Sequence, residues 1–348
     1  MQGIGAALLV PGTLAIISRA FPERGEQARA IGIWPASAAS RYRPVHCSAA
    51  CWCKPGVAVG VLLNVPIVLI AGVVAARIVR PEDDRGTGRL DRAGTVLGAL
   101  VLATATFAVI QAGQAGLDVP VIAAIVVAVL SLVGYLRVER TVADPMLPLG
   151  LFRRPAFSTA NGVAGVMNLG TLGLLFLLTL FLKDLQHRSA LGAGVAVLPL
   201  FLPLAVLAPL AGRVTARIGP KPPMLAGLLL AGVGLLATWT PSTPYLQLLP
   251  GMLCWGIGLG ILTPAVVAAA IAAAPPERSG LASGVNNTAR QAGGAITAYG
   301  ATAGQPGKAG HFLTGLHVAG LVTTGLFVLA AAGTAVLIPT HTDQEAHR

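Results

Sequence analysis

Long apolar runs separated by short polar segments fill almost the whole chain. A helix that crosses the hydrocarbon core of a bilayer needs about 20 predominantly apolar residues, and runs of about this length recur from the first residues to the last. The candidate spans, of which the second is interrupted, are 3–18, 30–40, 59–79, 93–113, 119–136, 157–182, 190–211, 223–239, 245–273, 280–301 and 314–338. The pattern predicts an all-α membrane protein with about 10–11 transmembrane helices.

The composition is that of a membrane protein. Of the 348 residues, 55% are hydrophobic and 11% are charged, and the mean hydropathy is +0.76. An ordinary soluble domain carries roughly a quarter of charged residues, so a soluble core is not expected. A bias to Arg over Lys, together with 43 Gly and 25 Pro, is typical of a GC-rich bacterial genome.

The polar segments between the runs alternate in their basic content. One set holds or adjoins 17 of the 24 Lys and Arg residues: 18–29, 80–92, 137–154, 212–223, 275–278 and the tail after Pro339. The other set holds three: 111–120, 183–189, 240–245 and 305–312. Basic loops stay in the cytoplasm, so we expect a multi-pass protein of the plasma membrane (the bacterial inner membrane) with a cytoplasmic C-terminus. The net charge of +11 is spread over these loops, which does not favour nucleic-acid binding.

The run at 280–301 differs from the others because polar side chains interrupt it. On a helix, one of its faces collects residues at spacings of four and three: Ser283, Asn287, Arg290, Gly294 and Thr297. A charged group on a spanning helix is costly in lipid and faces a wet cavity or a partner. The face therefore predicts one wall of a polar pathway.

The predicted pathway residues come from two runs. They are Asn286, Asn287, Arg290 and Gln291 with Asn161 and Asn168, which lie seven apart on one face of the run at 157–182. Two interpretations stay open. The amides and Arg290 either line a substrate pathway, or they form hydrogen bonds to backbone carbonyls and neighbouring helices as part of the packing.

Two glycine-containing motifs predict local structure. Gly256, Gly258 and Gly260 predict close helix packing in the run at 245–273. The segment Gly212 to Lys221 places basic residues around a tight turn at Gly219-Pro220, and its key residues are Gly212, Arg213, Arg217, Gly219 and Lys221. By their composition alone, these residues are ordinary cytoplasmic anchors.

Several of these stretches together resemble the 14-helix drug:proton antiporters of the major facilitator superfamily. Residues 2–17 resemble the fourth helix of that family, 29–34 the entry to the fifth and 62–66 the entry to the sixth. Residues 212–221 resemble the C-terminal copy of its loop motif, and 279–295 resemble its thirteenth helix. In the loop motif Ala216 stands where the family has an acid, which weakens the gating role that the resemblance gives to this loop.

The resemblance implies a domain organisation in which three helices are absent from the start. Residues 1–79 are then a remnant of the N-terminal six-helix half (helices 4–6), and 80–156 hold two extra central helices with cytoplasmic loops. Residues 157–338 form a complete C-terminal six-helix half, and 339–348 form a cytoplasmic tail. The first span would run from outside to inside, so we expect a truncated chain.

The segment from Arg41 to Gly56 does not fit a membrane helix. The resemblance places an apolar helix here, yet the segment holds three basic residues and three of the four Cys. A metal site of His46, Cys47, Cys51 and Cys53 matches no common zinc spacing. A reading-frame error explains more, because the codons read two bases late can give the Gly-Pro-x-x-Gly-Gly motif that the family has there.

The function implied by the resemblance is proton-coupled efflux of drugs or other amphipathic compounds, impaired in this truncated form. It implies no cofactor and no metal, the proton gradient as energy source, and a monomer in the bilayer. All 13 Asp and Glu fall in loops, at helix ends or in the tail, so the coupling carboxylate is expected in the absent helices. His317 is a lone titratable residue inside a span.

Three alternatives remain. They are a transporter of another solute such as a sugar or metabolite, a non-functional pseudogene product, and an intramembrane lipid transferase that uses the acidic run Glu82, Asp83 and Asp84. The chain contains no phosphate-binding loop and no hydrolase or metalloprotease motif, so we predict that it is not an enzyme.

Overall fold

The computed structural model describes a helical bundle that holds eight of the predicted spans. The described residues are 26, 30, 91–142, 145, 147–236, 243–275, 278–302 and 309–339. The spans at 3–18 and 59–79, almost all of 30–40, and the segment 41–56 with its metal-site and reading-frame hypotheses lie outside these residues.

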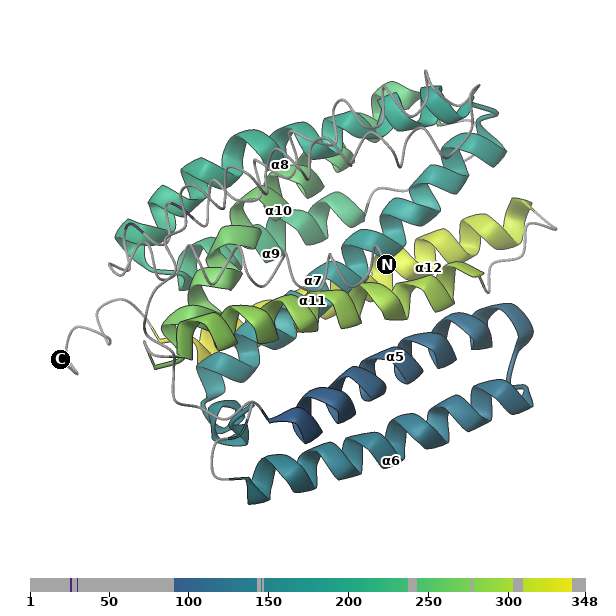
Figure 1. Ribbon diagram of the computed structural model, residues 1–348. Coiled ribbons are helices and arrows are strands. Elements are labelled where there is room, and N and C mark those ends of the chain that lie inside the picture. Colours follow the sequence, from purple (N-terminus) through teal and green to yellow (C-terminus); the bar gives the residue numbers. More distant parts are fainter. Residues whose placement is uncertain are drawn as a thin grey trace, which may run out of the picture.

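Eight long helices run side by side in the described part (Figure 1). They are α5 (Arg92–Ala115), α6 (Val119–Thr141), α7 (Pro155–Leu180), α8 (Ala190–Ile218), α9 (Lys221–Leu235), α10 (Tyr245–Ala272), α11 (Ser279–Thr302) and α12 (Ala309–Leu337). A short 3-10 helix, Leu149–Arg153, precedes α7, and a π-helical turn, Phe181–Leu185, follows it. The predicted all-α membrane fold is confirmed.

Side-chain caps begin several of these helices close to the predicted positions. Asp91 Oδ1 accepts a hydrogen bond from the Gly94 N–H at 2.8 Å, and Asp118 Oδ1 accepts one from the Val121 N–H at 3.1 Å. Ser189 Oγ caps α8 by accepting from the Gly192 N–H at 3.0 Å. Such caps satisfy backbone donors that have no partner in the first turn of a helix.

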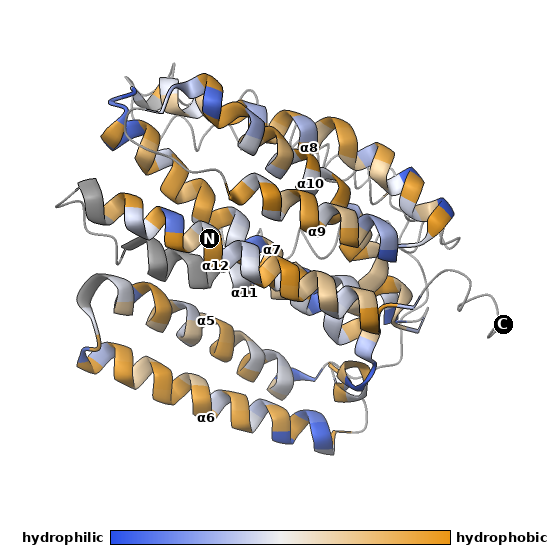
Figure 2. Ribbon diagram, turned by 180° about the vertical axis from the view of Figure 1, so that it is seen from behind, coloured by the Kyte–Doolittle hydropathy of each residue, from blue (hydrophilic) through white to orange (hydrophobic). Residues whose placement is uncertain are grey.

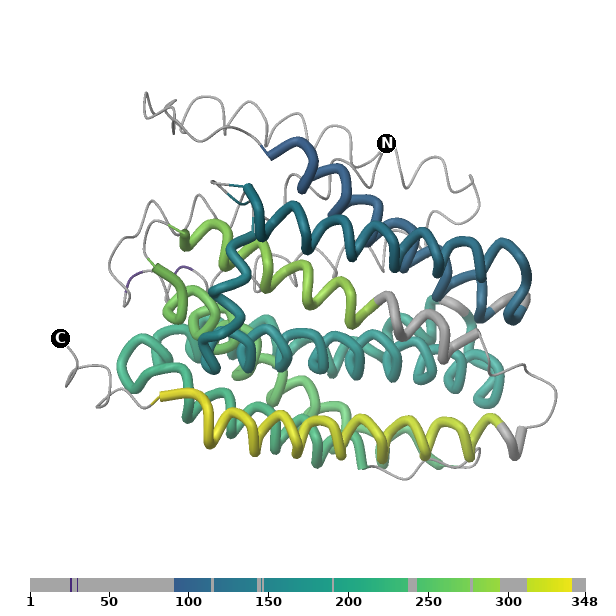
Figure 3. Tube along the Cα trace, turned by 90° about the horizontal axis from the view of Figure 1, so that it is seen from below, coloured from purple at the N-terminus to yellow at the C-terminus, as the bar shows by residue number. Residues whose placement is uncertain are grey.

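The helices form two connected groups. The hairpin of α5 and α6 lies along one side of the molecule, and α11 joins it to the other helices through contacts with α5 and α7 (Figures 1 and 3). Helix α10 packs against α7, α8, α9 and α11, while α12 covers α7 and α9. Helix α11 is therefore the element through which the hairpin meets the rest of the bundle.

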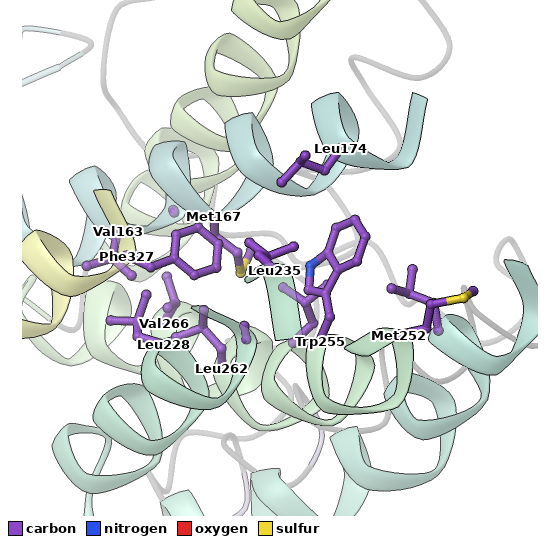
Figure 4. Packing of buried hydrophobic residues seen from close by; sticks show 14 of the residues in the cluster. Val163, Met167, Leu174, Leu228, Leu235, Met252, Trp255, Leu262, Val266 and Phe327 are labelled. Atoms are coloured by element: carbon purple, nitrogen blue, oxygen red, sulfur yellow. The ribbon is translucent and has the colours of Figure 1, made fainter. Parts of the chain in front are cut away.

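The centre of the larger group is α10, where the predicted close packing of glycines is confirmed. A Cβ on Gly256 would meet the Leu200 carbonyl oxygen of α8, and one on Gly258 would lie 2.7 Å from Ala231 Cα of α9. Because glycine has no side chain, three backbones approach closely here. Trp255 and Met252 of α10 are fully buried beside these contacts (Figure 4).

Many large apolar side chains are exposed, as lipid contact requires, and hydrophobic residues make up most of the long helices (Figure 2). In the described part, six helices are long and apolar enough to cross a membrane. Helix α9 is a shorter apolar helix, described over 15 residues. Helix α11 has 24 residues but is not among the six, because its polar side chains lower its hydropathy. This agrees with the polar interruption of the run at 280–301 seen in the sequence.

Where the structure describes them, the two predicted sets of polar segments lie at opposite ends of the helices. Gln186 Nε2 donates to the Thr243 carbonyl at 3.0 Å and joins two weakly basic segments. Arg154 Nη1 donates to the Ala273 carbonyl at 3.1 Å and ties the basic segment before α7 to the last turn of α10. The alternation that the loop charges predict is present in the bundle.

One helix boundary corrects the sequence analysis. Helix α6 continues to Thr141, beyond the predicted end at 136, so Glu139 lies inside the helix and not in a loop. Its side chain is 4% exposed. The extra helical turn packs against the beginning of α5, which shields this carboxylate from solvent.

Candidate functional site

The predicted pathway residues meet at the seam between α7 and α11. The two helices approach closely because small residues face each other. A Cβ on Gly293 would collide with the Gly165 carbonyl oxygen, and one on Gly165 would lie 3.3 Å from the Ala289 carbonyl oxygen. Residues later in α7 contact residues later in α11, so the two helices run parallel along the seam.

Two of the predicted amides bond to each other inside this seam. Asn286 Nδ2 donates to Asn161 Oδ1 at 3.3 Å, and Asn161 Nδ2 donates to the Phe157 carbonyl at 2.8 Å within α7. Asn161 is 5% exposed and Asn286 is 1% exposed. Ser283, also fully buried, donates its hydroxyl proton to the Gly280 carbonyl at 2.8 Å. This part of the polar face is a closed contact between helices.

The other predicted pathway residues keep part of their surface accessible. Gln291 is exposed, whereas Asn287, Arg290 and Asn168 are half-buried. Asn168 Nδ2 lies 3.7 Å from the position that a Cβ on Gly294 would take, so it reaches α11 beside a glycine. The structure thus divides the six candidates into a buried pair and four residues that remain partly open.

The position of each residue around α11 explains whether it is buried or partly open. Asn286 points into the seam with α7, and Asn287 and Gln291, spaced four apart, lie on a neighbouring face. Arg290 is one turn from both Asn286 and Asn287. A cationic guanidinium flanked by amide donors and acceptors can bind an anionic or strongly polar group, and the amides alone can accept or donate hydrogen bonds.

The predicted turn at Gly219-Pro220 is confirmed at the junction of α8 and α9. Gly219 has φ +81° and ψ 171°, and its N–H bonds to the Thr215 carbonyl at 3.0 Å, which ends α8. Arg213 and Arg217 are exposed, Lys221 is half-buried at the start of α9, and Gly212 is buried. The predicted gating residues thus lie together at one end of the bundle, with the two arginines directed outward.

Sequence reasoning missed a polar cluster at the opposite end. The Arg188 guanidinium lies 4.7 Å from the centre of the Tyr245 ring, a cation–π arrangement. The Tyr245 hydroxyl donates to the Ala196 carbonyl of α8 at 2.9 Å. Together with the bond from Gln186 to Thr243, these contacts join the loop between α7 and α8 to the start of α10. No motif marks them, because the partners lie about 50 residues apart.

A metal centre has no support in the described residues, where no group of three His, Cys, Asp or Glu side chains could hold an ion. The four partly open pathway residues and the basic turn at Gly219 are therefore the candidate functional features of the described helices.

Comparison with known proteins gives a family match over most of the chain. The family model described as Major Facilitator Superfamily matches residues 54–298. The methylenomycin A resistance protein of Streptomyces coelicolor is 34% identical over 85% of this chain and 63% of its own length. The puromycin resistance protein pur8 of Streptomyces alboniger is also 34% identical, over 85% of this chain and 60% of its own length.

Two further matches are more distant. The multidrug resistance protein Stp of Mycobacterium tuberculosis is 29% identical over 85% of this chain and 56% of its own length. The crystal structure of the human organic anion transporter MFSD10 (TETRAN) aligns with a TM-score of 0.43 and 15% identity, over 93% of this chain and 89% of that one. The chain covers between 56% and 63% of the length of these three bacterial relatives.

Proposed function

Because the chain belongs to the major facilitator superfamily, we propose that it exports amphipathic or cationic compounds across the cell membrane as a proton-coupled secondary transporter. The observation that carries the proposal is the similarity to resistance proteins, among them a multidrug efflux pump from Mycolicibacterium smegmatis. Membership in a family of transporters sets aside the lipid-transferase alternative.

The domain organisation belongs to the same proposal. Helices α7 to α12 make up the C-terminal six-helix half at 157–338, and the α5–α6 hairpin makes up the two extra central helices within 80–156. Residues 1–79, assigned to the N-terminal half, lie almost entirely outside the described residues. In transporters built from such repeats, substrate binds near the middle of the membrane at the interface between the two halves. The side of α11 that is not closed by α7 and α5 is the surface we assign to that interface.

Within this surface, Arg290, Asn287 and Gln291 of α11 and Asn168 of α7 are proposed to line the substrate pathway. Their partial exposure supports the assignment, since a residue sealed between two helices cannot contact a substrate. Asn161 and Asn286 are assigned a different role, namely to hold the two helices of the wall together. The basic turn with Arg213, Arg217 and Lys221 is proposed to lie on the cytoplasmic side, with the C-terminus.

The test is transport by the full chain in everted membrane vesicles. A proton gradient is imposed, and a fluorescent lipophilic cation and a pH-sensitive dye are followed together. We expect substrate accumulation that collapses with the gradient, and proton movement when substrate is added. The absence of proton movement for every lipophilic cation tried would count against drug export, and sugar- or metabolite-dependent proton movement would favour transport of another solute.

Matched variants test whether the residues proposed to line the pathway take part in transport. Arg290→Ala and Gln291→Ala are expected to lower transport at unchanged amounts of protein in the membrane. Thr288→Ala is the control, because the exposed Thr288 hydroxyl bonds only within its own helix, to the Gly284 carbonyl at 3.0 Å. Equal transport by all three variants would show that Arg290 and Gln291 do not line the pathway.

A further inference from the structure

Two carboxylates approach the same glycine at one end of the α5–α6 hairpin. Asp91 is the N-cap of α5, and Glu139 lies in the last turn of α6. Both approach Gly94. The Asp91 Cγ lies 2.9 Å and the Glu139 Oε1 lies 3.2 Å from the position that a Cβ on Gly94 would take. The glycine leaves room for the two acids to share one small site.

Each acid uses one oxygen in a backbone hydrogen bond and leaves the other without a donor. Asp91 Oδ1 accepts from the Gly94 N–H at 2.8 Å, and Glu139 Oε2 accepts from the Leu147 N–H at 3.0 Å. The remaining oxygens, Asp91 Oδ2 and Glu139 Oε1, are buried and have no hydrogen-bond partner among the described residues. A buried carboxylate oxygen without a donor is costly, and two ionised carboxylates beside the same glycine also repel each other.

We propose that Asp91 and Glu139 bind one proton between them and act as a proton-binding site at the junction of the two extra helices with the bundle. One acid is protonated and donates to the free oxygen of the other, which satisfies both buried oxygens at once. The proton is taken from solvent water on the loop side of the pair and returned there.

The neighbours of the pair in the described part of the chain include a tyrosine and three arginines. Tyr135, one turn before Glu139 on α6, packs its ring on Gly98 of α5, forms a side-chain hydrogen bond with Glu139 and lies within electrostatic reach of Asp91. The nearest basic residues in sequence are Arg92, Arg137 and Arg140, and their side chains are exposed. Both free oxygens are buried, which favours a proton over a hydrated metal ion.

The site is joined directly to the segment that enters α7. Through Glu139 Oε2 and the Leu147 N–H, the end of α6 holds the chain just before the 3-10 helix at Leu149. Loss of the proton would leave two adjacent negative charges between α5 and α6. The proton therefore stabilises the contact by which the hairpin is held at this end.

Infrared spectroscopy of the purified full chain in lipid nanodiscs tests the proposal, and it requires no transport. At neutral pH, the C=O stretch of a protonated carboxylic acid should be present and should shift in D2O. Glu139→Gln and Asp91→Asn should each remove this band, because the introduced amide donates to the remaining carboxylate. Asn also caps helices well, so Asp91→Asn keeps the test valid if Glu139→Gln folds poorly.

Asp118→Asn is the matched control, since Asp118 caps α6 at the other end of the same hairpin in the same way. This variant should leave the band unchanged. Identical spectra for the wild type and both pair variants would overturn the proposal. Loss of the wild-type band on adding Na⁺, K⁺ or Ca²⁺ at constant pH would overturn it in favour of a metal-ion site. Failure of drug transport would leave the band as expected, so the two proposals are tested separately.

Discussion

At the scale of single residues, the seam between α7 and α11 depends on glycine and asparagine in different ways. Glycine sets how closely the backbones approach, because any Cβ at Gly293 would overlap the Gly165 carbonyl. Asparagine sets the register, because Asn286 reaches Asn161 only when the two helices align at this point. Apolar packing alone would allow the helices to slide.

Gly293→Ala should therefore destabilise the protein. The added methyl group must push two backbones apart, and overpacking of this kind costs about 1–3 kcal/mol. Gly284→Ala on the same helix is the control, because no atom lies within 4 Å of its Cβ position. Thermal unfolding in detergent should show a lower midpoint for Gly293→Ala alone. Equal midpoints would mean that the seam is looser than described.

The pair Asn161 and Asn286 should show coupling in a double-mutant cycle with alanine. Each single variant leaves the other amide without its partner in a buried seam, so the double variant should lose less than the sum of the two singles. Hydrogen bonds between membrane helices contribute about 0.6 kcal/mol on average and up to about 1.7, and we expect coupling in that range. Asn287→Ala combined with Asn161→Ala is the control pair. A coupling energy near zero for Asn161 and Asn286 would contradict the bond.

At the scale of elements, helix ends matter as much as helix faces. Helix α8 must stop within two residues of the start of α9, and the backbone of Gly219 makes this possible. Its φ of +81° with ψ of 171° belongs to a region that is essentially reserved for glycine. The last turn of α6, by contrast, extends beyond the apolar run, and this extension places Glu139 beside α5.

Gly219→Ala should weaken the junction of α8 and α9. The conformation costs a residue with a Cβ about 1–3 kcal/mol, which should lower the thermal midpoint. Gly194→Ala, on the same helix with open space at its Cβ position, should be neutral or slightly stabilising because alanine favours helices by about 1 kcal/mol. If both substitutions change the thermal midpoint equally, the backbone conformation of Gly219 is not what ends α8.

At the scale of the whole molecule, the two ends of the bundle differ in charge. The end with Arg154, Arg213 and Arg278 carries the basic loops, and the end with Asp184 and Thr243 carries few. Because basic loops remain cytoplasmic, we expect the end that carries the basic loops to face the cytoplasm.

Site-directed labelling should reveal this orientation. In a background with all four Cys replaced, single cysteines are placed at two exposed positions, Asp184→Cys and Arg278→Cys. A membrane-impermeant maleimide should label position 184 in intact cells and position 278 only in everted vesicles. The unsubstituted background should stay unlabelled. Labelling of both positions from the same side would contradict the predicted topology.

The sequence by itself determined the helical membrane fold, because a spanning helix must satisfy its backbone internally and present about 20 apolar residues to lipid. It also determined the alternation of the loops and the turn at Gly219-Pro220, which depend on local composition. Even the polar stripe on 280–301 follows from helical periodicity, since Ser283, Asn287 and Arg290 are fixed relative to one another within one helix.

Only the tertiary structure decided which of these polar residues are sealed and which stay accessible. Asn161 and Asn286 are 125 residues apart, and periodicity gives each helix a face but does not say which helix lies opposite. The pairing of Asp91 with Glu139 was hidden for the same reason, and also because the apolar run ends before α6 does. Close contacts at Gly165, Gly293 and Gly94 select these partners, and such contacts exist only once the helices have packed.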